Sequence, residues 1–274
     1  MTALVRAWGA YAQVFALGVQ NTVVYRWNFL LRAAVSLVPL VSTYFLWGAA
    51  FRGSSSSTIA GYSYPAMMAY YFTLVILDSF TAPTEDDFQI ASDIRDGKIS
   101  QLLLKPLNYF LYRFLLFLSG RLIYIAVAAL PLALLLWGFR SFFAGVPVER
   151  TLLPAALAFA GSAVLQFTIS FTTGLIAFWL LEVGSIVFML FSLEYLAGGH
   201  VFPLDLLPEP WRSVAMASPF GYEYFFPAAV FLGRITGPAL WWGFLGQLAW
   251  IGVLLGVAGG IWKLGLRKYT AVGN

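Results

Sequence analysis

The chain has 274 residues, a formal net charge of +4, 61% hydrophobic residues and only 10% charged residues. Soluble domains carry about 25% charged residues, so this composition excludes an ordinary soluble protein. Mean hydropathy is +0.81, and continuous apolar runs of about 20 residues indicate membrane-spanning helices rather than a β-barrel. The sequence contains no cysteine, which excludes disulfides, thiol chemistry and cysteine metal sites. We therefore expect an all-α membrane protein with a single transmembrane domain over residues 1–274.

The first expected element is an interfacial helix over residues 4–20. Residues at spacings of three and four share one apolar face, namely Leu4, Trp8, Tyr11, Phe15 and Val19. This pattern is typical of a helix that lies in the membrane surface, and a frayed cytosolic start is the alternative. The stretch lacks a clean apolar core followed by a cleavage site, so we expect no removable signal peptide.

Six apolar stretches are predicted to cross the membrane. They cover residues 29–51, 62–83, 111–137, 152–175, 184–199 and 240–264. Arg121 lies early in the third stretch, where its long side chain could reach the near interface. Residues 198–238 contain six prolines and are too broken for one span, yet too apolar for a free loop. We expect short re-entrant helices there, on the extracellular side.

A charged island lies between the second and third stretches, over residues 84–113. It cannot sit in lipid, because each charge at mid-bilayer costs about 2.5–3.5 kcal/mol. Thr84 fits a helix-starting cap, and Gly97 breaks the helix that follows. We expect Ser100 to cap a second short helix over residues 101–105. The result is a bent, amphipathic, water-facing element whose apolar residues need a partner surface.

Lysine and arginine set the predicted orientation. Six crossings put both termini and the charged island on one side, which then carries most of the 16 Lys and Arg residues. The positive-inside rule places that side in the cytoplasm. We therefore expect a multi-pass protein of the plasma membrane, the inner membrane in bacteria, with both termini cytoplasmic.

Nucleotide hydrolysis and metal chemistry have no residues to support them in this sequence. There is no G-x-x-x-x-G-K-[ST] phosphate loop, since residues 97–100 lack the upstream glycine. The single histidine, His200, excludes a multi-histidine metal site, and no Ser-His-Asp set is evident. We expect no catalytic residue, no metal and no cofactor on this chain. Uphill transport would need an ion gradient or another subunit.

Two stretches carry a resemblance to a known family. DIRDGKISQLLLKPLN, residues 93–108, resembles the cytoplasmic coupling segment of type-2 ABC (ATP-binding cassette) permeases. Residues 198–233, GGHVFPLDLLPEPWRSVAMASPFGYEYFFPAAVFLG, are similar to that family's extracellular re-entrant segment. GLIAFWLLEVGS and the closing KLGLRKYTAVGN look like one uncharacterised-permease branch. The resemblance covers nearly the whole chain in order.

The resemblance implies a transport subunit without enzyme activity of its own. Permeases of this family work in pairs, either with an identical chain or with a sister permease, and two cytoplasmic ATPases bind the ATP and Mg²⁺. It implies export, with amphipathic or lipid-like solutes as the expected cargo. No nucleic acid is expected as a partner. A membrane scaffold or assembly subunit is one alternative, and an ion-coupled transporter is another, although that class usually shows several mid-span carboxylates.

The island supplies the residues expected to couple to the ATPase. Its apolar residues would fill a groove, its charged residues would pair at the rim, and its glycine would make the bend. These residues are Asp93, Ile94, Arg95, Gly97, Leu102, Leu103 and Lys105. Glu182, in the turn between the fourth and fifth stretches, either makes a second ATPase contact or is simply solvated.

Three ionisable residues in or near the spans are candidates for a translocation pathway. For Asp78 we favour a structural cap or an ion pair with Arg113 or Arg121. Glu194 either faces a pathway and favours cationic solutes, or packs against an arginine. For His200 we favour a hydrogen-bonded place in the re-entrant segment over a proton relay.

Small residues line one face of the sixth stretch at intervals of four. Gly252, Gly256 and Gly260 would allow another helix to approach closely. We favour packing within the chain over a role in a dimer interface.

Overall fold

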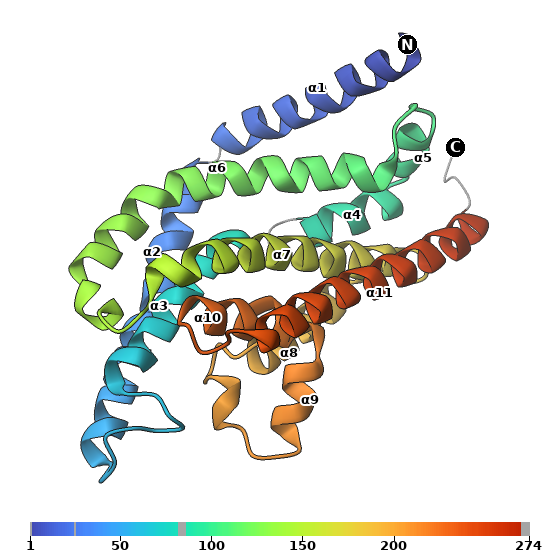
Figure 1. Ribbon diagram of the computed structural model, residues 1–274. Coiled ribbons are helices and arrows are strands. Elements are labelled where there is room, and N and C mark those ends of the chain that lie inside the picture. The colour runs from blue at the N-terminus through green and yellow to red at the C-terminus, as the bar shows by residue number, and fades with distance from the viewer. Residues whose placement is uncertain (1, 25, 82–85, 270–274) are drawn as a thin grey trace.

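The computed structural model describes residues 2–24, 26–81 and 86–269. These residues form helices joined by short loops (Figure 1), with no strand among them, which confirms the all-α prediction. The elements in chain order are α1 (Thr2–Val24), α2 (Arg26–Gly53), α3 (Tyr64–Thr81), α4 (Asp86–Arg95), α5 (Lys98–Leu103), α6 (Tyr109–Gly138), η1 (Arg140–Phe143), α7 (Val148–Gly174), η2 (Leu175–Phe178), α8 (Gly184–Ala197), η3 (Leu204–Leu206), α9 (Trp211–Ala217), η4 (Gly221–Phe225), α10 (Phe226–Phe231) and α11 (Pro238–Lys268).

Three helices in the described chain are long and apolar enough to cross a bilayer: α6, α7 continued by η2, and α11. They have 30, 31 and 31 residues, or about 45 Å at 1.5 Å per residue. The hydrocarbon core is about 30 Å thick, so each has length to spare. Helix α8 is apolar but has only 14 residues. At about 21 Å, it is too short to cross the core alone, unlike the predicted fifth span.

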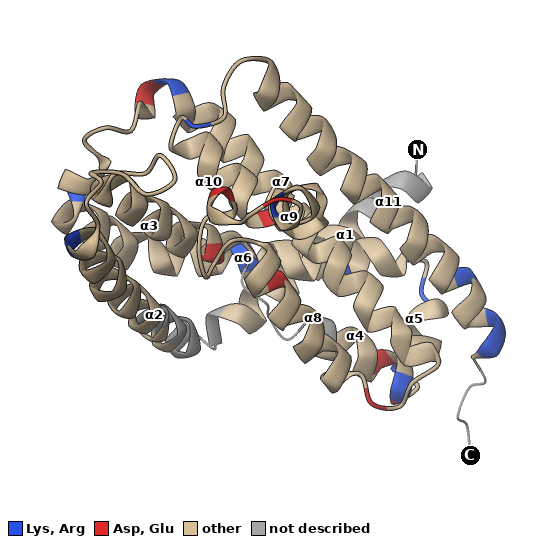
Figure 2. Cartoon of the chain, turned by 90° about the horizontal axis from the view of Figure 1, so that it is seen from below, with Lys and Arg blue, Asp and Glu red and all other residues tan. Residues whose placement is uncertain are grey.

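Most of the length of the long helices carries no charged residue. Figure 2 shows basic residues at the end of α11 and acidic and basic residues side by side near α4 and α5. Both ends of the described chain lie on the same side of the molecule as α5 (Figure 1). This arrangement places the positively charged end of α11 beside the charged island, as the sequence predicted.

Buried apolar side chains form two main clusters toward opposite ends of α7 and α11. The first cluster packs α3 against α10 and the early part of α7, around Tyr70, Phe159 and Phe226. The second packs α4 and α5 against the start of α6 and the late parts of α7 and α11. The charged island is therefore part of a core, and not a loop in free solution.

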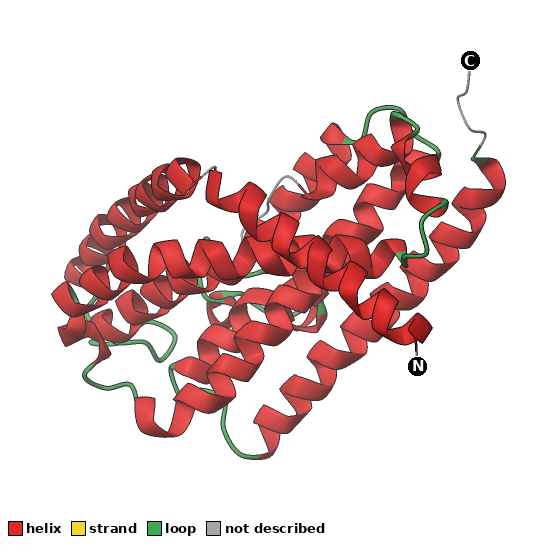
Figure 3. Cartoon of the chain, turned by 90° about the horizontal axis from the view of Figure 1, so that it is seen from above, coloured by secondary structure: helices red, strands yellow, loops and turns green. Residues whose placement is uncertain are grey.

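Helix α1 runs alongside the first half of α6, and the two helices cross in the view of Figure 3. The Tyr11 hydroxyl accepts a hydrogen bond of 3.0 Å from the backbone N–H of Asn108. Further along, Gly18 leaves no room for a side chain, because an added Cβ would lie 2.0 Å from Ser119 Oγ. This close approach fixes α1 to α6 through a helix–helix contact in addition to any contact with the membrane surface.

The proline-rich segment, residues 198–238, folds into η3, α9, η4 and α10. Two tyrosines of α3 hold its first residues: Tyr70 donates to the Gly199 carbonyl at 2.8 Å, and Tyr71 donates to the Val201 carbonyl at 2.8 Å. These bonds satisfy backbone carbonyls that the broken helix would otherwise leave open. The segment is thus packed onto the domain as short helices, in agreement with the prediction of broken helical structure.

Candidate functional site

The island forms a helical hairpin of α4 and α5, bent at Gly97. Gly97 has φ +75°, a left-handed conformation that glycine adopts without steric cost. The second helix begins at Lys98, three residues before the predicted start. Ser100 is therefore not its cap, and its hydroxyl lies 3.0 Å from the Tyr269 hydroxyl at the end of α11. The proposed cap at Thr84 lies outside the described residues.

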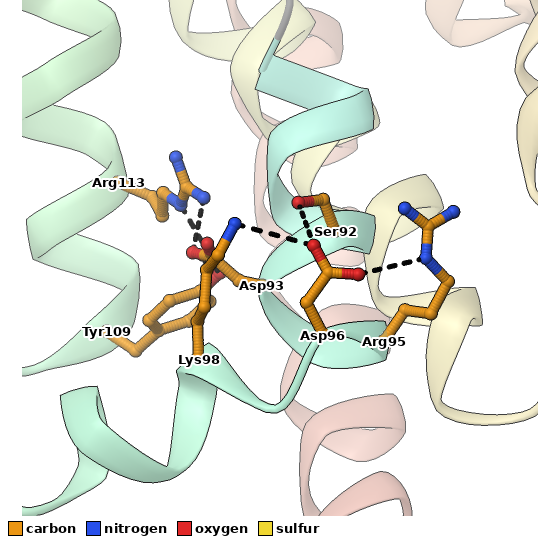
Figure 4. Close-up of polar contacts among 7 residues, drawn as sticks. All are labelled: Ser92, Asp93, Arg95, Asp96, Lys98, Tyr109 and Arg113. Carbon is orange, nitrogen blue, oxygen red and sulfur yellow. Dashed lines mark hydrogen bonds and ion pairs between the residues drawn. The ribbon is translucent and has the colours of Figure 1, made fainter.

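A polar cluster on α4 and α6 holds the hairpin in place (Figure 4). Arg113 Nη2 and Asp93 Oδ2 form an ion pair, and only 4% and 13% of these side chains are exposed. Tyr109 donates a hydrogen bond to the same carboxylate at 3.0 Å, and Arg113 Nη1 donates to Gln89 Oε1 at 3.1 Å. Asp93 was predicted to pair with an ATPase at the rim of a groove. That assignment is wrong, because the side chain is largely buried and its Oδ2 atom is bound by Arg113 and Tyr109 within the domain.

The apolar face of the hairpin also points inward. Ile90, Ile94 and Ile99 are 0%, 3% and 0% exposed and pack into the second cluster with Phe171 and Leu175 of α7 and η2. Ile94 was predicted to enter an apolar groove of the ATPase. The structure corrects this assignment, since the side chain is buried within its own domain.

The outer edge of the hairpin remains available to a partner. Leu103 is 45% exposed and Leu104 is 87% exposed, and Lys105 is also exposed. Leu102 is partly buried, because it packs against the second cluster. Sequence reasoning chose Leu102 and Leu103 and missed Leu104, whose position after the end of α5 turns it outward.

Charges on the hairpin pair with one another at the surface (Figure 4). Arg95 Nε lies 3.1 Å from Asp96 Oδ1, and Lys98 Nζ lies 3.4 Å from Asp96 Oδ2. Hydrogen bonds from Arg95 and then Ser92 lower the pKa of Asp96. Arg95, predicted as a rim residue, is therefore exposed but already paired within the hairpin.

Glu182 lies close to this hairpin. Its carboxylate accepts a hydrogen bond of 2.7 Å from the backbone N–H of Gly184 at the start of α8. The preceding η2 packs against α4, and a Cβ on Gly184 would lie 3.8 Å from Phe88 of α4. The predicted second contact residue is thus exposed beside the first predicted coupling element.

The three residues predicted for a pathway lie in one connected cluster. His200 Nε2 is 3.2 Å from Asp78 Oδ1, and its ring lies edge-on to Tyr224 with centroids 4.1 Å apart. The Tyr224 hydroxyl donates to Glu194 Oε1 at 3.0 Å. The expected ion pair of Asp78 with Arg113 is wrong, since Arg113 binds Asp93 and Asp78 lies against His200.

The other arginine considered for Asp78 also behaves differently from the prediction. Arg121 is 4% exposed, and its guanidinium lies over the ring of Phe117, 4.8 Å from the centroid. The side chain therefore turns inward toward an aromatic face instead of reaching to the membrane interface.

Glu194 opens onto a groove between α7 and α8 with a volume of about 250 Å³. One wall carries Gln166, Ser170 and Thr173 of α7, while Phe188 and Phe191 of α8 form much of the other. Phe88 of α4 also lines the groove, so the coupling hairpin and the groove share a residue. This wall was not predicted from the sequence, although Gln166, Ser170 and Thr173 recur at helical spacing and mark a polar stripe on a membrane-length helix.

A comparison with known protein families identifies the family of this chain. A family model described as ABC-2 family transporter protein matches residues 37–273. The chain belongs to this family. No curated protein matches it. As an ABC-2 type permease with apolar helices of membrane length, it is a multi-pass membrane protein, and family membership implies association with an ABC ATPase.

The glycines spaced at intervals of four on α11 of this ABC-2 permease do not pack as predicted. A Cβ added to Gly252, Gly256 or Gly260 would meet no atom of the described residues within 4 Å. The favoured role of these glycines in packing within the chain is therefore wrong. Packing glycines of α11 lie elsewhere: Gly246 lies against Tyr222 and Gly265 against Phe178. A dimer interface at the exposed glycines stays a prediction.

Proposed function

We propose that this chain is the membrane-spanning subunit of an ATP-driven exporter for amphipathic or lipid-like solutes. Its helices would cross the membrane with both termini and the α4–α5 hairpin in the cytoplasm of a bacterial cell. Two such permeases, identical or sister chains, would work with two separate ATPase subunits that bind ATP and Mg²⁺. The family match over residues 37–273 supports the permease role, and the positive-inside rule supports the orientation.

The coupling role is supported by the attachment of the hairpin to the membrane helices and by its exposed outer edge. Its inner face is fixed by Ile90 and Ile94 to α7 and η2, and by the Asp93–Arg113 ion pair to α6. Its outer edge leaves Leu103 and Leu104 exposed. An apolar edge on a water-facing element favours a protein partner. A force on that edge would therefore be passed to membrane-length helices and not absorbed by a flexible loop.

The same hairpin provides a route from the ATPase to the solute. Phe88 of α4 is part of the wall of the groove between α7 and α8. A displacement of α4 would change the shape of this groove directly, because packed interiors do not absorb shifts of an ångström without rearrangement. We propose that closure of the ATPases on ATP moves the hairpin and so alters the solute's surroundings near Glu194.

The test substitutes the exposed leucines of the outer edge and leaves the buried residues of the hairpin unchanged. In a tagged permease purified from native membranes, Leu103→Asp with Leu104→Asp is expected to abolish a co-purifying ATPase, identified by its Walker motifs in peptide sequencing and by vanadate-sensitive ATP hydrolysis. Gln101→Asp is the matched control, since it adds an acidic group to an exposed position of the same helix without removing apolar surface. Unchanged ATPase recovery in the double variant, with normal membrane insertion, would remove the coupling proposal.

A further inference from the structure

A cavity of about 470 Å³ lies where α1, the hairpin and the first turns of α6 meet. This volume is within the roughly 300–1,000 Å³ typical of sites for small ligands. Val14 and Leu17 of α1 and Leu116 of α6 supply apolar lining, while the hairpin supplies polar and charged lining. A ligand that fits this cavity therefore combines an apolar part with a charged part.

The cavity lies at the depth of the lipid headgroups. At 30 residues, α6 is about 45 Å long, which exceeds the hydrocarbon core by about 15 Å. Charged residues are costly within the core, so the hairpin lies outside it, beside the first turns of α6. The lining residues Tyr112 and Leu116 are about 5 Å and about 10 Å along the helix from its start. A phospholipid can therefore place its headgroup in the cavity while its acyl chains follow α6 into the membrane.

Lys98 is the cation in the lining that keeps unused hydrogen-bonding capacity. Its side chain is 58% exposed, and its ammonium lies 3.4 Å from Asp96 Oδ2 (Figure 4). Exposed pairs of this kind contribute little to stability, and an ammonium has further N–H groups to donate. Arg113, the other cation in the lining, is already bound to the Asp93 carboxylate. Lys98 is therefore the group placed to bind a phosphate in the cavity.

One oxygen of Asp93 is a matching acceptor. Arg113 and Tyr109 both donate to Oδ2, and no described residue donates a hydrogen bond to Oδ1. The side chain is 13% exposed, and Oδ1 is not among the fully buried polar atoms that lack a partner. Because Asp93 lines the cavity, a ligand inside it can reach this oxygen with an N–H group.

We propose that this cavity binds the headgroup of phosphatidylethanolamine, with the phosphate at Lys98 and the ammonium at Asp93 Oδ1. The two ends of this zwitterion match the unused N–H groups of the lysine and the unused carboxylate oxygen, and both contacts are charge-assisted hydrogen bonds. The acyl chains begin against Leu17 and Leu116. Phosphatidylcholine has no N–H for Oδ1, and phosphatidylglycerol has no positive charge to place there. The bound lipid joins α1, the hairpin and α6, a role separate from solute transport and ATPase coupling.

The first test titrates the delipidated, detergent-purified permease with dioleoyl phosphatidylethanolamine and follows bound lipid by native mass spectrometry. We expect one lipid per chain to bind more tightly than any further lipid. Lys98→Gln, which keeps a polar side chain at an exposed position, should weaken this binding about tenfold or more, as expected when a hydrogen bond to a charged group is lost. Lys268→Gln, an exposed lysine at the end of α11 and outside the cavity, should leave it unchanged.

The second test varies the lipid and keeps the wild-type permease, so it does not depend on how a variant folds. Phosphatidylcholine and phosphatidylglycerol with the same acyl chains should each bind at least about tenfold more weakly than phosphatidylethanolamine. N,N-dimethyl phosphatidylethanolamine, which retains an N–H, should bind more tightly than phosphatidylcholine. Glycerophosphoethanolamine, which has the headgroup but no acyl chains, should not displace the lipid at equal concentration.

Three outcomes would overturn the inference. They are equal binding of phosphatidylethanolamine and phosphatidylcholine, tighter binding of phosphatidylglycerol, and undiminished binding to Lys98→Gln. Displacement by glycerophosphoethanolamine would contradict the assignment to a membrane lipid, because it would show that a soluble headgroup suffices.

Discussion

Asp93 of α4 and Arg113 of α6 form an ion pair that is largely withdrawn from water, with 13% and 4% of their side chains exposed. The pair joins the hairpin to the first turns of a membrane-length helix. Tyr109 and Gln89 complete the hydrogen bonds around it, which is the condition under which a buried pair holds two elements together. We regard this pair as the rigid link through which the hairpin acts on the membrane helices.

Removal of either partner of this pair should destabilise the protein. Breaking a buried pair costs about 3–5 kcal/mol, and the residual exposure of Asp93 points to the lower end, about 3 kcal/mol. Asp93→Ala and Arg113→Ala should each lower the thermal unfolding midpoint in detergent, and the double variant should lower it by less than the sum. Strictly additive shifts would show that the two groups do not interact in the folded protein.

Ile94 and Leu104 should respond in opposite ways to the same substitution. Ile94→Ala removes a buried side chain and should cost about 2–5 kcal/mol. Leu104 is exposed, so Leu104→Ala should change the free energy of unfolding by about 0.5 kcal/mol or less. The same substitution should weaken ATPase recovery. Thermal unfolding and co-purification on the same samples separate the two effects. A large stability loss for Leu104→Ala would mean that its side chain is buried.

Gly97→Ala should strain the bend between α4 and α5. A residue with a Cβ in a left-handed conformation costs about 1–2 kcal/mol, although an added Cβ would find only Tyr269 Oη nearby, at 3.8 Å. Amide hydrogen exchange should increase over α5, and Gly97→Asn should have a smaller effect, since asparagine tolerates this conformation. Gly145→Ala is the control, because it has open space and no left-handed φ. Equal exchange for Gly97→Ala and Gly145→Ala would contradict the assigned bend.

Arg234 should hold the end of the molecule opposite the hairpin. Its guanidinium lies 3.6 Å from the centroid of the Tyr62 ring, 3.3 Å from Asp205 Oδ2 and 3.2 Å from the Gly61 carbonyl. Arg234→Ala should cost about 1–2 kcal/mol and make the loop at residues 59–62 exchange faster or become more sensitive to protease. Arg150→Ala, at an exposed position of the same end, should not. An unchanged loop would show that these contacts contribute nothing measurable.

Local patterns in the sequence were sufficient to predict much of the fold. Apolar length located three of the six predicted spans, α6, α7 and α11, to within a few residues, because burial in lipid imposes long uninterrupted runs. It overestimated the fifth, since α8 has only 14 residues. Gly97 located the bend, since few other residues suit such a turn. The helical period also showed correctly that Ile94 lies on an apolar face. It could not show which surface covers that face, and the structure buries it against α7 instead of a partner.

Contacts between distant parts of the chain account for the errors. Asp78 pairs with His200, which lies 122 residues away along the chain, and no local pattern favours this pairing over one with Arg113. Gln166 was overlooked because a single amide in an apolar helix carries a weak signal. The stripe that it forms with Ser170 and Thr173 becomes meaningful only when α8 is placed opposite it.

The outer edge of the hairpin should face the cytoplasm and be covered by an ATPase. The chain has no cysteine, so Leu104→Cys supplies a single thiol for labelling with a membrane-impermeant maleimide. We predict no labelling in intact cells, labelling in inverted membrane vesicles stripped of peripheral proteins, and protection in vesicles that keep the ATPase. Labelling in intact cells would put the hairpin outside the cell and contradict the account.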